Sequence, residues 1–249
     1  MAKIIVLLKQ VPDLVEDLEV DASGKALDRS DIKFKLNEFD DHALEEAILL
    51  KESGSVDQVV AMAVDGDDVD KILFKAIAKG ADKAVKLTGG NPIDSHQLGK
   101  AFSNALDSEG YDLVFTGVQS VDDRDGQLGP IIASYMNRPC VSVVSGVFVS
   151  GVTVVVHKEY SAGMMGEFEV DLPAVLGIQA AKQSPRYAPV SKIRQVQQTV
   201  SIKEAGMGDL GPGGGSSVAN MAPPEKGTGA EMLDDVGDLM GVLKDKGAL

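Results

Sequence analysis

The first 130 residues alternate short aliphatic blocks with segments of helical periodicity, and this alternation restricts the fold more than any other feature. Residues 4–8 (IIVLL) are apolar without interruption, a pattern typical of a strand that is buried on both faces. Further strands are predicted at residues 58–64, 83–87 and 112–116. Strands that are separated by helices pair in parallel through crossovers. The sequence therefore predicts an α/β fold with an open, mostly parallel sheet and helices on both faces.

Helical periodicity fills the intervals between these blocks. Asn37 is the predicted N-cap of the first helix, because an acid, Asp40, follows three residues later. Gly80 suits the C-terminal end of the second helix, and Ser95 is the predicted N-cap of the third. The second, third and fourth predicted helices cover residues 67–79, 95–109 and 127–137.

After Pro139 the pattern changes to the alternation that is typical of antiparallel strands. Ser150-Gly151 is a hairpin signal between two such strands, and Pro173 separates the last two. The second half is therefore predicted to be rich in strands, at residues 141–149, 152–160, 167–172 and 174–178.

The C-terminal part has a different composition. Residues 204–231 contain eight glycines and three prolines among 28 residues, which predicts a flexible arm. An apolar stripe on a short acidic helix follows, made of Met232, Val236, Leu239, Met240 and Leu243. A helix of this length is marginal in isolation and needs a surface to lie on. That surface belongs either to the same domain or to another subunit.

Composition excludes several classes of function. The net charge of −14 opposes binding to nucleic acid, and the single cysteine, Cys140, excludes an internal disulfide or a cysteine-cluster metal site. No apolar run reaches the length of a membrane span, and residues 1–11 lack the pattern of a secretory signal. The sequence therefore predicts a cytoplasmic protein without stable membrane insertion.

The loop at residues 117–130 (GVQSVDDRDGQLGP) is the strongest candidate for a site. It follows a buried strand and precedes a helix, and ligands of open α/β sheets bind beyond the carboxyl ends of the strands. The N–H groups of the helix start suit a phosphate, and Gly126 and Gly129 allow a close approach of the backbone. The glycine-rich fingerprints of common NTPases and dinucleotide-binding proteins are absent.

The acids of this loop admit two roles. Asp122, Asp123 and Asp125 either bind ribose hydroxyls and cap the helix, or hold a divalent cation, for which the spacing is poor. Lys9, which follows the first strand, is either an ordinary basic residue or a cation for the phosphate. Cys140 has the surroundings of a small buried hydrophobe. The residues alone thus indicate a nucleotide-binding α/β protein with no catalytic group and no metal site.

Five segments resemble those of one protein family, the β subunits of electron transfer flavoproteins. The chain resembles these subunits along nearly its whole length, and the five segments occur in the same order with matching separations. They are KQVPD (9–13), LNEFDDHALEEAILLKE (36–52), AIAKGADKAV (76–85), DLVFTGVQSVDDRDGQLGP (112–130) and LPAVLGIQ…SPRYAPVSKI (172–193).

The resemblance implies a Rossmann-like, adenine-nucleotide-binding domain in a heterodimer. The α subunit would hold most of an FAD, and the β subunit would carry AMP as a structural nucleotide. The protein would be an electron carrier and not an enzyme, passing electrons from a flavin dehydrogenase to an acceptor oxidoreductase. The implied AMP site comprises Leu7, Leu8, Lys9, Asn37, Asp40, Val64, Gly117, Gln119, Asp122, Asp123, Arg124, Gly126, Gln127, Leu128 and Gly129.

The resemblance also implies a recognition loop at about residues 183–196 that docks onto partner dehydrogenases or reductases. Its docking residues would be Pro185, Arg186, Tyr187 and Val190, with Val190 as the apolar anchor. In this family the C-terminal helix contacts the α subunit. We therefore expect a nucleotide-binding domain over residues 1–200, and an arm with a C-terminal helix over residues 201–249.

Electron-bifurcating relatives bind a second FAD in place of AMP. They tend to have Gly, Asp and Thr where this chain has Asp123, Arg124 and Asp125, and Pro where it has Glu38. These departures favour AMP over a second FAD, which stays open as a possibility. An adenine-nucleotide hydrolase and a nucleotide sensor of the same fold are two further functions that a crevice of this kind can serve.

Overall fold

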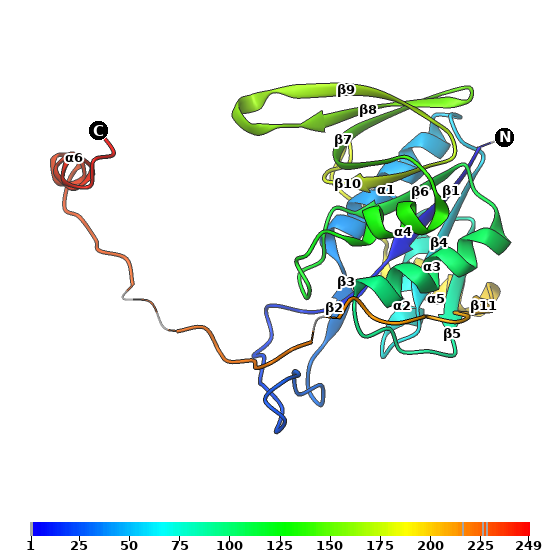
Figure 1. Ribbon diagram of the computed structural model, residues 1–249, viewed down its shortest axis with the longest axis horizontal. Coiled ribbons are helices and arrows are strands. Elements are labelled where there is room, and N and C mark those ends of the chain that lie inside the picture. The colour runs from blue at the N-terminus through cyan, green and yellow to red at the C-terminus, as the bar shows by residue number, and fades with distance from the viewer. Residues whose placement is uncertain (1, 216, 226, 228) are drawn as a thin grey trace. The chain divides into compact units, whose positions relative to one another are not determined.

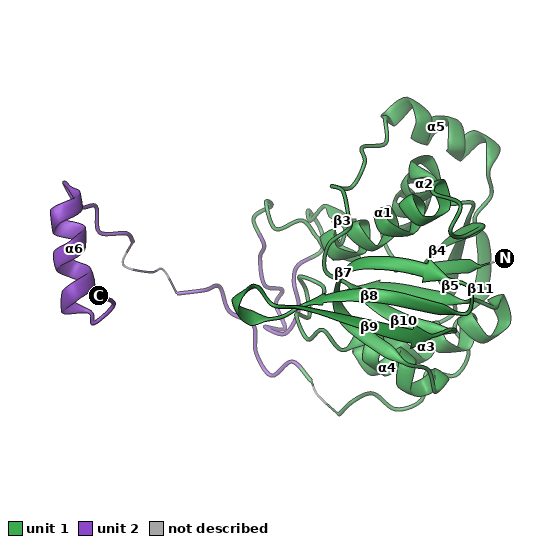
Figure 2. Ribbon diagram, turned by 90° about the horizontal axis from the view of Figure 1, so that it is seen from above, with its two compact units in different colours: residues 1–17, 29–217 green, residues 18–28, 218–249 purple. Residues whose placement is uncertain are grey.

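The computed structural model describes residues 2–215, 217–225, 227 and 229–249. The chain divides into two compact units (Figure 2). Unit 1 comprises Met1–Asp17 and Arg29–Ser217, and unit 2 comprises Leu18–Asp28 and Val218–Leu249. Lys203–Gly206 and the residues up to Ser217 thus belong to the same unit as the sheet.

One large sheet forms the centre of unit 1. Within the described residues it has nine strands in the order β11-β5-β4-β1-β6-β10-β7-β8-β9 (Figure 1). Pairing is parallel from β11 to β7 and antiparallel between β7, β8 and β9. The mostly parallel sheet and the strand-rich second half are therefore confirmed. The strands are β1 Lys3–Leu8, β4 Gln58–Val64, β5 Lys83–Thr88, β6 Leu113–Gly117, β7 Cys140–Ser150, β8 Thr153–Glu159, β9 Met165–Asp171, β10 Ala174–Ile178 and β11 Lys203–Gly206.

Helices cover both faces of this sheet. Figure 2 shows α1, α2 and α5 on one side and α3 and α4 on the other. Such coverage is what a parallel sheet requires, because both of its faces are apolar. The helices of unit 1 are α1 Glu38–Glu52, α2 Val69–Lys79, α3 Ser95–Glu109, α4 Leu128–Met136 and α5 Val190–Thr199.

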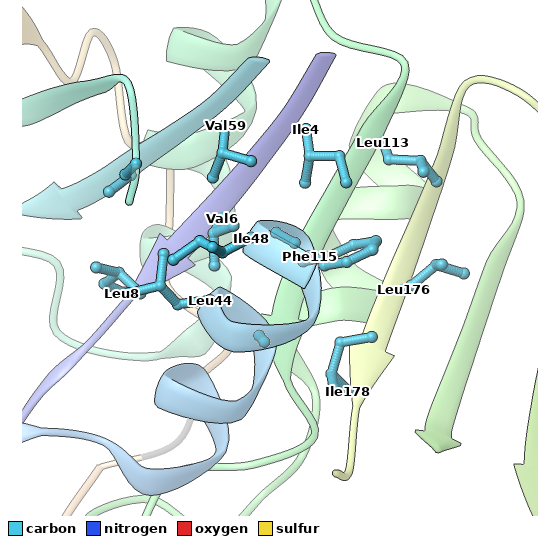
Figure 3. Packing of buried hydrophobic residues seen from close by; sticks show 14 of the residues in the cluster. Ile4, Val6, Leu8, Leu44, Ile48, Val59, Leu113, Phe115, Leu176 and Ile178 are labelled. Atoms are coloured by element: carbon cyan, nitrogen blue, oxygen red, sulfur yellow. The ribbon is translucent and has the colours of Figure 1, made fainter. Parts of the chain in front are cut away.

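The central strand β1 shows why an uninterrupted apolar block predicts a strand that is buried on both faces. Its alternate residues Ile4, Val6 and Leu8 pack into the cluster that contains α1 (Figure 3). Ile5 and Leu7 point the other way, into the cluster under α3 and α4. All five side chains are buried, so the strand has no polar face.

Two helix caps differ from the sequence-based prediction. The N-cap of α3 is Asp94 and not Ser95, because the Asp94 carboxylate accepts the Gln97 N–H at 2.9 Å. Asn37 does occupy the N-cap position of α1, but its side chain makes no capping hydrogen bond. Its amide instead donates to the Gln119 carbonyl at 2.9 Å, because α1 begins beside the loop that follows β6.

Several short elements were not predicted, because segments of three or four residues show no periodicity. A small antiparallel pair follows β1, and a single 3-10 turn precedes β9. These elements are β2 Gln10–Pro12, β3 Phe34–Leu36 and η1 Ser161–Gly163.

The strand β11 pairs with β5 within the segment that was predicted to be a flexible arm, so this part of the prediction was wrong.

Unit 2 contains the C-terminal helix α6, Val236–Asp245. Asp235 caps it by accepting the Asp238 N–H at 2.9 Å. Val236, Leu239 and Met240 are 73%, 44% and 41% exposed, so the predicted apolar stripe lies open. In the part of the chain that the structure describes, no helix is both long enough and apolar enough to cross a membrane.

Candidate functional site at the switch point of the sheet

The strand order reverses direction between β1 and β6. From β1 the chain proceeds outward on one side to β4 and β5, and it then returns to place β6 on the other side of β1. Ligands of open α/β sheets bind at this switch point, beyond the carboxyl ends of the strands. The residues that follow β1 and β6, Lys9 and Val118, therefore occupy the position where a site is expected.

The Asp40 carboxylate joins the two strand ends. One oxygen accepts the Lys9 backbone N–H and the other accepts the Gly117 N–H, each at 2.8 Å. Asp40 is buried, and the loss of hydration raises the pKa of its carboxyl to about 7, although the two N–H groups act in the opposite direction. A single side chain of α1 thus sets the geometry of the switch point.

The close approach of α1 to β6 requires glycine at position 117. A Cβ atom there would lie 2.7 Å from the Cβ of Phe39 and would overlap a carboxylate oxygen of Asp40. Any side chain would therefore separate the two elements. Glycine at position 117 therefore serves the packing of α1 on β6, whereas the close approach expected at Gly126 and Gly129 was that of a ligand.

The Lys9 side chain crosses the site to the loop after β6. Its Nζ lies 3.0 Å from Ser120 Oγ, 2.9 Å from Asp122 Oδ1 and 2.5 Å from Asp123 Oδ2. Burial acts to lower the pKa of Lys9, but the two aspartates outweigh burial, and the net effect is a raised pKa. Lys9 is therefore a cation that the protein holds at the site.

The remaining acid of the loop, Asp125, contacts the starts of two helices. Asp125 Oδ1 accepts the Gln127 N–H at 3.0 Å, and Asp125 Oδ2 accepts the Ser95 hydroxyl at 2.5 Å. Arg124, at φ 53°, and Gly126, at φ 63°, give this loop its sharp turn. All three aspartates thus have partners in the protein.

Two hollows meet at Lys9. The first, of about 20 Å³, lies between the loop after β6 and the start of α1. Its lining residues are Lys9, Asn37, Asp40, Gly117, Val118, Gln119, Ser120, Asp123, Asp125, Gly126 and Leu128. The second, of about 170 Å³, lies beyond the ends of β1 and β4. Its lining residues are Leu8, Lys9, Gln10, Arg29, Val64, Asp65, Gly66, Asn91, Pro92, Leu98 and Phe102.

The structure thus brings ten of the fifteen expected site residues together around these hollows. The other five have different surroundings. Leu7 is buried in the core, Asp122 binds Lys9, and Arg124 is exposed. Gln127 is the N-cap of α4, and Gly129 packs against the Thr116 side chain, to which an added Cβ would come within 3.1 Å.

Two buried side-chain atoms near the first hollow have no hydrogen-bond partner among the described residues. They are Asn37 Oδ1 and Thr116 Oγ1. A buried polar atom without a partner costs about 1–3 kcal/mol, so an atom left in this state calls for an explanation. Asn37 itself lines the hollow, so its oxygen without a partner lies close to the candidate site.

Sequence reasoning missed the residues of the second hollow that lie outside the resembling motifs. Phe102 and Leu98 belong to the inner face of α3, where their helical spacing indicates only a core position. Asn91 and Pro92 lie in the loop after β5, and Gly66 follows β4. Gly66 is the exception, because residues 64–66 end a predicted strand at the edge of the sheet where ligands bind.

A larger hollow of about 480 Å³ lies between the end of α1 and the strands β7 and β8. Leu49, Phe148 and His157 are among its lining residues. It does not include the residues that follow β1, β4 and β6. Size alone therefore does not identify the candidate site, and the switch point remains the best-supported position.

The expected recognition loop is fixed to α1 by Arg186. Its guanidinium pairs with Glu45 at 2.9 Å and with Glu52 at 2.5 Å, and these acids raise its pKa. Because Glu45 is buried, Arg186 has a structural contact here and does not point away to solvent. Tyr187 and Val190 are exposed by 78% and 55%, and Pro185 is half-buried.

The fold and the hollows at its switch point define a doubly wound α/β protein with a candidate site at the carboxyl ends of its parallel strands. The electron transfer flavoprotein domain model matches residues 25–204 of this chain. The chain therefore belongs to the electron transfer flavoprotein family.

Its relatives are β subunits. The chain is 37% identical to the electron transfer flavoprotein subunit beta of Methylophilus methylotrophus, with 90% of each chain covered. It is 29% identical to the subunit beta of Mycobacterium leprae, over 96% of this chain and 94% of the relative. It is 27% identical to the subunit beta of Mus musculus, over 98% of each chain. The resemblance inferred from the five motifs is thus confirmed.

Proposed function

We propose that this protein is the β subunit of a heterodimeric electron transfer flavoprotein and acts as an electron carrier without a substrate of its own. In this proposal an FAD is held mostly by the α subunit, and electrons pass from a partner dehydrogenase to an acceptor oxidoreductase. The family membership and the near full-length similarity to β subunits support it. FAD supplies the one-electron chemistry, and this chain supplies the scaffold and the docking surfaces.

The nucleotide that this chain binds is, in our proposal, AMP at the switch point. The observation that supports this most is the pairing of two hollows that share Lys9. One is lined by Leu8, Val64 and Phe102 and offers apolar surface to an adenine ring. The other is lined by Lys9, Asn37 and Asp123 among others, whose polar groups could contact a ribose and a phosphate that lie beside it.

The residues around the first hollow, between the loop after β6 and the start of α1, fit an adenylate. Lys9 provides a positive charge, and the first turn of α4 provides N–H groups that have no partner within the helix. Gly126 has no side chain to cover the half-exposed backbone, and Asn37 Oδ1, which has no partner among the described residues, suits a ribose hydroxyl. The proposed binding of AMP is therefore supported by the positive charge of Lys9, by the N–H donors of α4 and by the missing side chain at Gly126.

The aspartates that hold Lys9 do not oppose this proposal. Asp122 and Asp123 neutralise Lys9 when no anion is present, and an arriving phosphate takes over this role. The exchange avoids a buried charge without a partner in either state, which would be costly. Lys9 is thus the residue that changes partners on binding.

The partner surfaces are proposed on two exposed segments. Val190 begins α5 and is the apolar anchor for a dehydrogenase or reductase, and Tyr187 lies beside it in the chain. Arg186 keeps this loop fixed to α1, so the anchor is presented in a defined position. The open apolar stripe of α6 is the proposed contact for the α subunit.

The test is to denature the purified complex and count the nucleotides released per heterodimer. We expect one FAD and one AMP. Two FAD molecules and no AMP would instead indicate a bifurcating type of subunit. A colourless protein that never associates with a flavin-containing partner would overturn the proposal.

A further inference from the structure

The glycine-rich segment after β11 lies on α3 for its first part. We call residues 207–214 the glycine strap. The strap begins with Met207, which is 1% exposed and packs in the core under α3. Asn104 of α3 donates its amide to the carbonyls of Met207, at 2.9 Å, and of Asp209, at 3.0 Å. The strap is therefore held along its first three residues.

The strap reaches the first turn of α3 at its other end. The Gln97 amide donates to the Gly211 carbonyl at 3.0 Å, and the Gly214 N–H donates to Asp94 Oδ2 at 2.6 Å. An added Cβ at Gly214 would lie 2.5 Å from His96 Cδ2. Gly214 thus lies in close contact with the His96 ring, and a side chain there would force this ring to move.

The same turn of α3 also holds the loop after β6 at residues 118–127, which we call the nucleotide loop because the proposed phosphate contacts lie in it. Ser95, the residue after Asp94, donates its hydroxyl to Asp125 Oδ2 at 2.5 Å. Asp125 in turn accepts the Gln127 N–H at the start of α4. Two adjacent residues, Asp94 and Ser95, therefore contact the strap and the loop respectively.

The geometry points to a coupling between these two contacts. We propose that the seated glycine strap fixes the first turn of α3 and so preorganises the nucleotide loop for the phosphate of an adenine nucleotide. This inference rests on the proposed AMP site. A loop that is already ordered loses less entropy on binding, so a seated strap raises affinity. By thermodynamic linkage the nucleotide also stabilises the seated strap.

The experiment uses the complete complex with its partner subunit, freed of nucleotide. Gly214→Val places a side chain against the His96 ring and is expected to weaken the seating of the strap on the first turn of α3. Gly227→Val is the matched control, because it lies in the same glycine-rich region with no atom within 4 Å of an added Cβ. We expect AMP affinity to fall about fivefold or more in Gly214→Val. It should stay unchanged in Gly227→Val, as measured by titration calorimetry.

Ser95→Ala separates the coupling from a general loss of structure. It removes the hydroxyl that connects α3 to Asp125, so Gly214→Val should cause no further loss of affinity in that background. Hydrogen exchange gives the reciprocal readout. AMP should slow exchange at residues 207–215 in the wild type but not in Ser95→Ala.

Failure of this inference is distinguishable from failure of the proposed function. A wild-type complex that binds AMP with the same affinity as Gly214→Val overturns the coupling alone. Equal losses in the wild-type and Ser95→Ala backgrounds also overturn it. A wild-type complex that binds no AMP overturns the proposed site, and the coupling with it.

Discussion

Asp40 Oδ1 accepts the Gly117 N–H at 2.8 Å, and this bond joins the first turn of α1 to the end of β6. The same carboxyl holds the Lys9 N–H with its other oxygen. The ends of the two strands that flank the switch point are therefore positioned by one buried group. Its protonation state accordingly affects both the stability and the shape of the candidate site.

Asp40 should make stability fall as pH rises from about 4 to about 7. Burial raises its folded pKa to about 7, so the folded protein keeps a proton that the unfolded chain releases near pH 3.9. The contribution lost over this window is of order 4 kcal/mol. Urea unfolding at several pH values, for wild type and Asp40→Asn, measures it. The stability difference, wild type minus variant, should decline with pH, and a flat difference contradicts this prediction.

Gly126→Val should lower the AMP content of the complex. Its side chain would occupy the space proposed for the phosphate and would strain a backbone that has φ 63°. Gly151→Val is the control, because Gly151 has the same φ of 63° in a turn with no atom within 4 Å. Both variants place valine at φ 63°, and in Gly126→Val the Cβ also comes within 3.3 Å of the Val118 carbonyl oxygen. Loss of AMP confined to Gly126→Val supports the assignment. Equal AMP content in the two variants would refute it.

Val190→Asp should slow electron transfer from the partner dehydrogenase by about tenfold and leave the heterodimer intact. An apolar anchor at the centre of a small interface carries much of its binding energy, and a carboxylate there is costly to desolvate. Gln197→Asp is the control, because it adds a negative charge at another exposed position of the same helix. Rates from stopped-flow mixing provide the measurement. Equal rates for wild type and Val190→Asp would remove the anchor role.

Arg186→Met should destabilise unit 1 by about 2 kcal/mol, because it leaves Glu45 buried without its cation. Arg186→Lys should recover only part of this loss, since one ammonium does not reproduce the forked contacts to Glu45 and Glu52. Arg29→Met is the control, because both partners of its ion pair with Asp67 are largely exposed. Thermal unfolding reports the differences. A loss of stability no greater than in Arg29→Met would contradict the proposal that Arg186 fixes the loop to α1.

Much of the fold was predictable because its strands have no polar face. Residues such as Ile5 and Val6 are buried on opposite sides of the same strand, and such strands give continuous apolar blocks. The long helices were equally clear from their spacing. Short elements such as β2 and β3 were not predictable, because three residues are too few to show a hydrophobic period and their pairing depends on tertiary contacts.

The site was predictable where chemistry and strand position coincide. Lys9 and Gly117 each lie at the end of a buried strand, and this position alone made them candidates. Phe102 and Asn91 were not predictable, because their presence depends on how α3 and the loop after β5 pack. The composition of residues 204–231 was misleading for a related reason. Glycine predicts flexibility in an isolated segment, but Gly214 serves for close packing on α3.

The exposed apolar side chains of α6 affect newly synthesised copies of this chain. Val236, Leu239 and Met240 leave an adhesive patch on an otherwise acidic polypeptide. Copies of this chain that lack the proposed α subunit would associate through that patch or lose the tail to proteases. In the proposed heterodimer, synthesis of the two subunits in equal amounts would limit both losses.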